Sequence, residues 1–169
     1  TLFRSLVTDT RGFRTSNVTP EVMRITVELM EAGAPLATIT RNGLDRRPLS
    51  VLQLWGIGLN RIEIEDGLVW TSLPVEMRRA VGADGVHAAG LSSALVSAEE
   101  AKVSAVFTEL EDGEVEVGFR AVPGYDVAQI ALALGGGGHA LAAGCLVPGP
   151  LTEAVERVVA MLKEELARQ

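Results

Sequence analysis

A run of four glycines followed by a histidine is the feature of this chain best suited to chemistry. Gly135 to Gly138 precede His139, and a further glycine follows at Gly144. Glycines let successive backbone N–H groups point into one concavity, and a helix beginning near His139 would add the positive end of its dipole. The group that such a backbone binds best is a phosphate. The alternative is a flexible turn between a helix and a strand, because a glycine run alone is a weak signal.

Arg120 is the positively charged residue that the strand pattern suggests as a second phosphate ligand. The alternation that follows the Asp112-Gly113 turn puts Val115, Val117 and Phe119 on one face of a strand and Arg120 on the other. A guanidinium group forms two parallel hydrogen bonds to a phosphate. Arg120 can equally be a solvated strand residue, and its position on a strand that ends beside a glycine-rich loop favours the ligand interpretation.

Asp9 is the remaining chemical candidate. It stands at the end of an apolar run and at the start of a glycine-containing loop, and in α/β sheets such strand ends host ligands and metals. Divalent cations need several oxygen or imidazole ligands, so one aspartate cannot hold a metal. The alternative is an aspartate that caps its own loop. His87 lies in a Gly- and Ala-rich connector and is not expected to join Asp9.

Hydrophobic spacing and turn residues predict the elements that position these side chains. Helices are expected from Pro20 to about Ala32, from Pro48 to about Leu59, from an N-cap at Asp126 to Leu134, and from Thr152 to about Ala167. Thr19 and Thr152 are the expected caps of the first and last of these helices. The apolar face of the first helix, with Met23 and Met30, is expected to be core rather than a ligand groove.

Two Asp-Gly pairs lie between alternating segments and predict β-hairpins. The first is Asp66-Gly67, between residues 62–65 and 68–70, and the second is Asp112-Gly113, between residues 103–107 and 115–122. Asp-Gly suits the primed two-residue turns that match strand twist.

Composition narrows the classes of function. The chain has 169 residues, a net charge of −7 and 4% aromatic residues, which argues against a broad basic surface for duplex nucleic acid and against an aromatic base-stacking platform. A nucleotide or a short oligonucleotide remains compatible. Cys145 is the only cysteine, which fits a reducing, cytoplasmic setting, and we expect it to be a small buried residue rather than a nucleophile. No apolar run is long enough to span a bilayer, and no signal peptide is apparent.

Two blocks of the sequence resemble the DHH phosphoesterases that carry a DHH-associated C-terminal domain, most closely the NrnA-like branch of oligoribonucleases and pAp phosphatases. Residues 7–17 resemble the last metal motif of the catalytic domain, usually Thr-Asp-Thr-Gly followed by an aromatic residue. Residues 117–121, 126–131 and 135–144 resemble the substrate-binding signature of the associated domain. The spacing between the blocks also matches, so the resemblance covers nearly the whole chain.

The resemblance implies a role for each candidate residue. Asp9 would be a manganese ligand, and the substrate phosphate would be held by the backbone of Gly136, Gly137 and Gly138, by His139 and by Arg120. Two manganese ions would activate a water and stabilise the phosphate under attack. The implied partners are short RNA or DNA oligonucleotides or pAp, with no membrane.

The chain departs from the family pattern in two ways. The upstream metal motifs, including the Asp-His-His that names the family, are absent from these residues, so the chain is expected to be a C-terminal fragment that supplies substrate binding and one metal ligand and is inactive alone. Locally, Arg11 precedes Gly12 where the family often has glycine at once, and Ala121 replaces the common serine after Arg120.

The expected fold is α/β in two parts. Residues 1–60 would end a parallel-sheet catalytic domain and add a connector helix, and residues 61–169 would form a smaller α+β associated domain. The segment Leu2–Val7, without its sheet neighbours, would expose apolar surface that invites strand pairing or a homodimer. Two other functions stay open. One is a non-catalytic nucleotide- or RNA-binding module, as at the ends of alanyl-tRNA synthetases, and the other is a single-strand exonuclease or cyclic-dinucleotide phosphodiesterase of the same family.

Overall fold

The computed structural model describes residues 2–15 and 17–168 and divides into two compact units, Thr1–Pro48 and Leu49–Gln169. The expected α/β fold class is confirmed, since the second unit is a six-stranded sheet with helices against it. The units divide earlier than the boundary that we predicted after residue 60. The reason is that helix α4 (Leu49–Leu59) packs against the sheet of the second unit.

The first unit consists of helices and loops in its described parts. Its helices are α1 (Leu2–Asp9), α2 (Pro20–Glu31), α3 (Leu36–Thr40) and a π-helical turn, η1 (Arg41–Asp45). The expectation that Leu2–Val7 is a strand-like segment with an exposed apolar surface is wrong except at Leu2, which is 67% exposed. The segment is helical, and Phe3 and Val7, four residues apart on one helix face, are 5% and 0% exposed. The argument for strand pairing through this segment therefore loses its basis.

Helix α2 begins where it was predicted but does not pack as predicted. The Thr19 hydroxyl accepts a hydrogen bond from the Val22 N–H at 3.3 Å, which confirms the cap. Four of its large apolar side chains are exposed rather than in a core, including Met23 at 44% and Met30 at 46%. Val22 and Leu29 are half-buried, and Thr26 is the buried residue of the helix. The core assignment for this helix is wrong.

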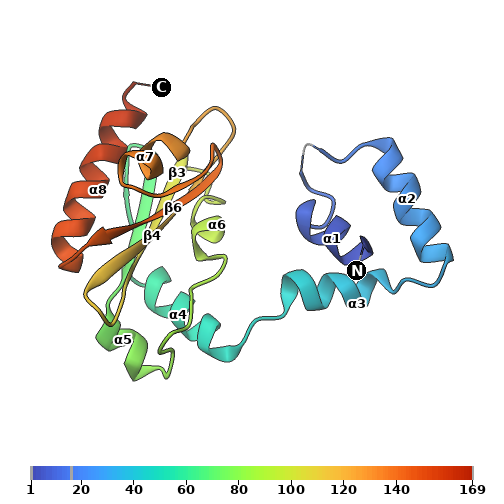
Figure 1. Cartoon of the computed structure of the whole chain (residues 1–169), viewed down its shortest axis with the longest axis horizontal. Helices are drawn as coiled ribbons and strands as arrows, with labels where there is room; N and C mark the ends of the chain where they lie inside the picture. The colour runs from blue at the N-terminus through green and yellow to red at the C-terminus, as the bar shows by residue number, and fades with distance from the viewer. Residues whose placement is uncertain (1, 16, 169) are drawn as a thin grey trace. The chain divides into compact units, whose positions relative to one another are not determined.

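The second unit contains one mixed sheet, with the strand order β1-β2-β3-β4-β6-β5 (Figure 1). The strands are β1 (Glu63–Glu65), β2 (Leu68–Leu73), β3 (Val103–Glu109), β4 (Glu114–Ala121), β5 (Gly137–His139) and β6 (Ala142–Pro148). Neighbouring strands are antiparallel except β2 and β3, which are parallel. A parallel pair needs a crossover, and residues 74–102 supply it with α5 (Val75–Ala80) and α6 (Leu91–Leu95).

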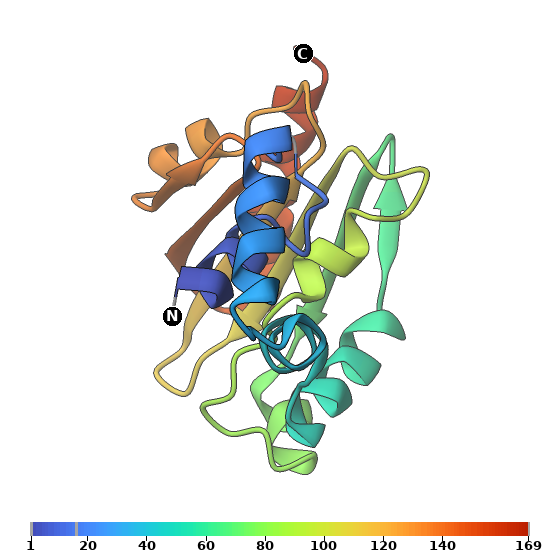
Figure 2. The same ribbon diagram turned by 90° about the vertical axis from the view of Figure 1, so that its right-hand side faces the viewer.

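The two faces of the sheet are covered differently. One face forms the main core with α7 (Ala128–Ala133) and α8 (Leu151–Leu166), and Val115, Val117 and Phe119 of β4 are each 0% exposed there. On the opposite face, a smaller cluster joins α4 and α6 to β2 and β3 (Figure 2). This cluster includes no residue of β4, β5 or β6. The outward faces of these three strands are therefore left outside both cores of the unit.

The turns confirm one hairpin in detail and correct the other. Asp66 and Gly67 have φ of 50° and 89°, as a primed two-residue turn requires. Between β3 and β4 the connection is longer, because the Leu110 N–H donates to the Glu114 carbonyl at 2.8 Å and only Gly113 has positive φ. The hairpin is confirmed, but its two-residue primed turn is not.

Of the predicted helix caps at Asp126 and Thr152, one is confirmed and the other is wrong. The Asp126 carboxylate accepts a hydrogen bond from the Ala128 N–H at 2.8 Å, so it caps the start of α7 as expected, although the helix begins one residue later. Helix α8 is confirmed, but Pro150 stands at its N-cap and no side chain caps it, so Thr152 is not the cap.

Candidate phosphate-binding site

The strand register brings Arg120 and His139 to one face of the sheet. Arg120 of β4 lies opposite Ala142 of β6, and Ala142 lies opposite His139 of β5. Directly opposed residues of antiparallel strands point to the same side, and adjacent strands are about 4.8 Å apart, so the two backbones are separated by about 10 Å. Two long polar side chains can therefore reach one small anion between them.

The position of Arg120 follows from the alternation of β4. The apolar residues on either side of it in the strand, Phe119 and Ala121, face the main core, so Arg120 faces outward and is half-buried. Its Nε donates to the Ser93 hydroxyl of α6 at 3.2 Å and its Nη1 donates to the Phe119 carbonyl at 2.9 Å. These bonds hold the guanidinium on the outer face of the sheet.

The expectation of a helix beginning near His139 is wrong. Helix α7 ends at Ala133, and Gly135 follows its C-cap with a φ of 80°. The Gly136 N–H donates back to the Ala131 carbonyl at 2.7 Å, which is the closing bond of a Schellman motif. The chain then enters the short edge strand β5, in which His139 is exposed. A helix dipole therefore contributes nothing here, and an anion would be bound by side chains and by the backbone of an edge strand.

Two of the four glycines are needed for packing. A Cβ atom on Gly136 would lie 2.1 Å from the Gly144 carbonyl oxygen, and one on Gly138 would lie 2.4 Å from the Ala143 Cα. The backbone of the run thus lies closer to β6 than any side chain would allow. Gly136 and Gly138 therefore have a packing role that needs no bound phosphate to explain it.

A row of glycines crosses the same face as Arg120. Gly118 of β4, Gly144 of β6 and Gly137 of β5 are opposed in register, and we call these three residues the glycine floor. A Cβ added to Gly118 or Gly137 would meet no atom within 4 Å. Sequence reasoning missed the floor, although a glycine between Val117 and Phe119 in a strand is a signal for close approach of a ligand or backbone.

A cavity of about 240 Å³ opens over one end of the floor. The connector before α6 and the outward residues of β3 and β4 line it, among them His87, Ser92, Glu116, Gly118 and Arg120. Gly136 to Gly138 and His139 are not among its lining residues; they lie in β5 or directly before it, and β5 is two strands away from β4 on the sheet. The sequence-predicted residues thus occupy one face, and the structure adds a cavity beside Arg120.

Comparison with known proteins identifies the domain. A family model described as the DHHA1 domain matches residues 75–168, which is more than half of the chain. The chain belongs to the DHHA1 family. The matched range includes Arg120, the glycine floor and His139, so all of the phosphate-binding candidates lie inside the DHHA1 domain.

The sequence relative confirms the predicted branch of the family. The bifunctional oligoribonuclease and PAP phosphatase NrnA of Thermus thermophilus is 37% identical over 166 residues, which are 96% of this chain and 49% of the relative. The chain therefore spans about half the length of the curated relative that it matches.

Solved structures show the same fold. An exopolyphosphatase-related protein from Bacteroides fragilis has a TM-score of 0.85 and 22% identity, with 96% of this chain and 47% of that chain covered. A pGpG-specific phosphodiesterase from Vibrio cholerae has a TM-score of 0.53 and 14% identity, with 98% of this chain and 57% of that chain covered. None of the helices in the described parts of the chain is long and apolar enough to cross a bilayer.

A buried arginine fixes the connector that forms the cavity wall of the DHHA1 domain. Arg78 is 4% exposed, and its guanidinium donates to the Glu109 carbonyl at the end of β3 and, at 3.3 Å, to the Val86 carbonyl. Val86 directly precedes His87, so Arg78 holds the backbone that carries His87 to the cavity. The His87 Nδ1 lies 3.2 Å from the Glu116 Oε2.

Cys145 is a structural residue of the same domain. It is 7% exposed in β6, and burial raises the pKa of its thiol to about 11, against a smaller opposing effect of Arg157. A thiol with this pKa is protonated at neutral pH and is a poor nucleophile. The buried, small-residue interpretation is thus the one the structure supports, although Gly144 before it lies in the strand rather than in a turn.

Asp9 lies outside the DHHA1 domain, at the exposed end of α1. The Thr8 hydroxyl is 3.5 Å from its Oδ1, and the loop after it holds Arg11, Gly12 and Phe13 with φ of 50°, 74° and 64°. Within residues 2–15 and 17–168, no group of three or more His, Cys, Asp or Glu side chains could hold a metal ion. The residues present therefore do not make a manganese site, and we derive no chemical step through a metal.

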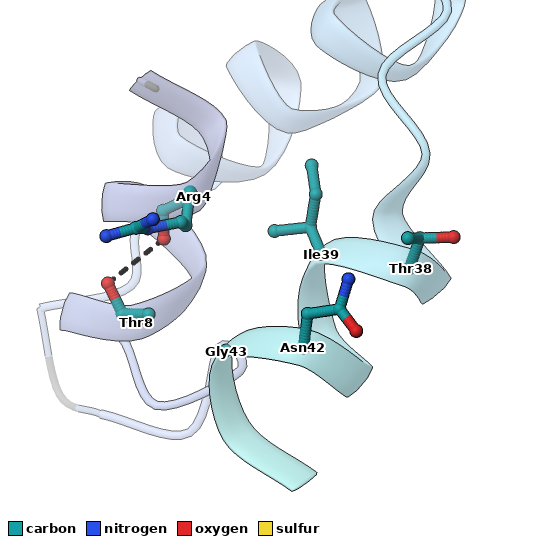
Figure 3. Close-up of a pocket in the computed structure, with 6 residues that line it drawn as sticks. All are labelled: Arg4, Thr8, Thr38, Ile39, Asn42 and Gly43. Atoms are coloured by element: carbon teal, nitrogen blue, oxygen red, sulfur yellow. Dashed lines mark hydrogen bonds between the residues drawn. The ribbon is translucent and has the colours of Figure 1, made fainter. Parts of the chain in front are cut away.

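A second cavity, of about 490 Å³, lies in the first unit beside α1. Figure 3 shows its lining from α1, α3 and η1, with Arg4 and Thr8 on one side and Ile39 and Asn42 on the other. The Thr8 hydroxyl donates to the Arg4 carbonyl at 3.0 Å, so this hydroxyl is used within its own helix. The cavity contains none of the residues predicted for phosphate or metal binding.

Proposed function

We propose that this chain is the substrate-binding part of a phosphoesterase that hydrolyses short oligonucleotides or pAp. The main support is that Arg120 and His139 lie on the same outward face of the sheet, each paired in register with Ala142. Between them they would hold one substrate phosphate, with the outer backbone edge of Gly137 and Gly138 as a further donor; the Gly136 N–H is already bonded to the Ala131 carbonyl. The name of the Thermus relative, an oligoribonuclease and PAP phosphatase, supports this substrate class.

Turnover is a separate part of the proposal. Asp9 would be one ligand of a manganese centre whose other ligands are not among the described residues, so we expect binding without hydrolysis from these 169 residues. The protein would act in the cytoplasm, a reducing setting that its single cysteine fits.

A non-catalytic nucleotide- or RNA-binding module is the second candidate. Such a module would use the same phosphate contacts, Arg120 and His139, and needs no metal ligand beside them. The two candidates differ in the full-length protein: only the phosphoesterase would show manganese-dependent hydrolysis of pAp that depends on Asp9.

The binding proposal is tested by calorimetric titration of the chain with pAp and with a dinucleotide, with and without manganese. Arg120→Gln should weaken binding about 10- to 100-fold, because a hydrogen bond to a charged group contributes roughly 1.5–3 kcal/mol. His139→Ala should weaken it without loss of thermal stability, since His139 is exposed. The double variant should lose less than the sum of the two single effects if both side chains bind the same phosphate.

Arg157→Gln is the matched control. It removes the same charge from an exposed position on α8, which covers the opposite face of the sheet. Equal loss of affinity in Arg120→Gln and Arg157→Gln would mean that only net charge matters and would refute the site. Hydrolysis by the chain itself would refute the division between binding and turnover.

A further inference from the structure

The outward residues of β4 place opposite charges at the two ends of an open groove. Glu116, Gly118 and Arg120 alternate with the core residues of this strand and line the same cavity. Outward residues of a strand are about 6.7 Å apart, so the backbones under the carboxylate and the guanidinium are about 13 Å apart, with no side chain between them. Gly118 is paired with Gly144 of β6, so the surface without side chains extends from β4 onto β6.

The opposite charges at the two ends of the groove would orient a bound nucleotide. A nucleotide carries its negative charge on the phosphate and its hydrogen-bond donors on the edge of the base. An ionised carboxylate only accepts hydrogen bonds, and it repels a phosphate. The phosphate would therefore lie at the Arg120 end, towards His139, and the base would lie over Gly118 with its donor edge towards Glu116.

Two neighbours of Glu116 suit it to base recognition. Leu146 is its partner in the register of β4 and β6, faces the same side, and is 52% exposed, so it offers an apolar surface next to the carboxylate. His87 contacts the carboxylate through Nδ1 at 3.2 Å and so orients it. An exposed leucine beside a floor without side chains is the kind of surface that can cover the flat face of a base, and no Phe, Tyr or Trp is among the residues that line this cavity.

We infer that this groove is a nucleobase subsite and that Glu116 makes it selective for bases with hydrogen-bond donors, guanine most of all. Guanine presents an imino N–H and an amino group side by side, which match the two oxygens of a carboxylate. Adenine and cytosine present one amino group on the corresponding edge, and uracil presents one imino group. The inference rests on the proposed function, because the base is that of the nucleotide whose phosphate Arg120 and His139 bind.

The test is calorimetric binding of four dinucleotides, GG, AA, CC and UU, to the 169-residue chain. The unmodified chain should bind GG about tenfold more tightly than UU, in line with the discrimination that a two-bond contact to a base provides. In Glu116→Gln the preference for GG should fall to about twofold, with UU affinity changed little. Arg120→Gln should weaken all four dinucleotides by a similar factor.

Glu114→Gln is the control for the loss of a negative charge. Glu114 lies on the same strand and faces the same side, but it is exposed at the strand end and does not line the cavity. This variant should keep the preference for GG, and thermal unfolding of all variants checks that the fold is retained.

The outcomes separate the two proposals. Equal affinity for the four dinucleotides, or an equal loss for all four in Glu116→Gln, would overturn the base subsite. If binding still depends on Arg120 in that case, the proposed phosphate site survives. No binding of any dinucleotide would overturn both.

Discussion

At the scale of single residues, the glycines of β4, of β5 and directly before β5 fall into two kinds. Gly136 and Gly138 permit backbone approach, since a Cβ atom at either position would collide with β6. Gly118 and Gly137 stand in open space and have no positive φ, so neither packing nor backbone conformation requires a glycine there. A glycine that the fold does not need fits the close approach of the ligand that we propose for this face.

Gly118→Ala is therefore expected to separate binding from stability. The new methyl group would meet no protein atom within 4 Å, and alanine is about 0.5–1 kcal/mol better than glycine in a strand, so the free energy of unfolding should stay equal or rise. Nucleotide affinity should fall about 5- to 100-fold if the methyl group overpacks a ligand, at a cost of roughly 1–3 kcal/mol. Chemical denaturation and calorimetry measure the two quantities.

The control is Gly56→Ala, an exposed position on α4 where the added Cβ would also meet nothing within 4 Å. It should leave affinity unchanged. Unchanged affinity in Gly118→Ala as well would mean that no ligand contacts the floor.

Single-residue predictions from the sequence succeeded where side-chain alternation decides the outcome. The outward direction of Arg120 followed from the buried Val117 and Phe119 beside it. The contact between His87 and Glu116 could not be predicted, because it joins residues 29 positions apart through a connector whose path depends on the buried Arg78.

At the scale of elements, the sequence predicted those with strong periodicity and missed those set by tertiary contact. Helices α4 and α8 and the strands around Asp66-Gly67 followed from local patterns. Strand β5 did not, because glycines carry no strand preference and its conformation comes from pairing with β6. The apolar segment of α1 is too short for its period to distinguish a helix from a strand.

The β5–β6 hairpin gives a prediction at this scale. Gly138→Ala should destabilise the domain by roughly 1–3 kcal/mol, because Gly138 has a φ of 145° and the new Cβ would lie 2.4 Å from the Ala143 Cα. Gly137→Ala, one residue earlier in the same strand, should change the free energy of unfolding by less than about 1 kcal/mol. Urea denaturation of both variants measures the difference, and equal stability of the two would show that β5 is not paired as described.

At the scale of the whole molecule, the two compact units divide the candidate functions between them. All candidate phosphate and base contacts lie in Leu49–Gln169, while Asp9 lies in Thr1–Pro48. The first unit also carries the exposed apolar residues of α2.

Residues 49–169 expressed alone should therefore fold cooperatively and bind pAp with the affinity of the whole chain, within about a factor of two or three, the usual context dependence of single contributions. Circular dichroism during heating and calorimetric titration measure the two properties. A shortened chain that folds but has lost affinity would show that the first unit contributes to binding, contrary to the assignment made above.

The parallel pairing of β2 with β3 has a consequence for the order of folding. Strands β3 and β4 are joined by a short local connection, whereas β2 can join β3 only after residues 74–102 have been closed into a crossover. Closing a long connection costs chain entropy before its contacts can form, which slows folding. The same crossover carries His87 and α6, so the wall of the cavity beside Arg120 would be among the last parts of the molecule to form and among the first to open.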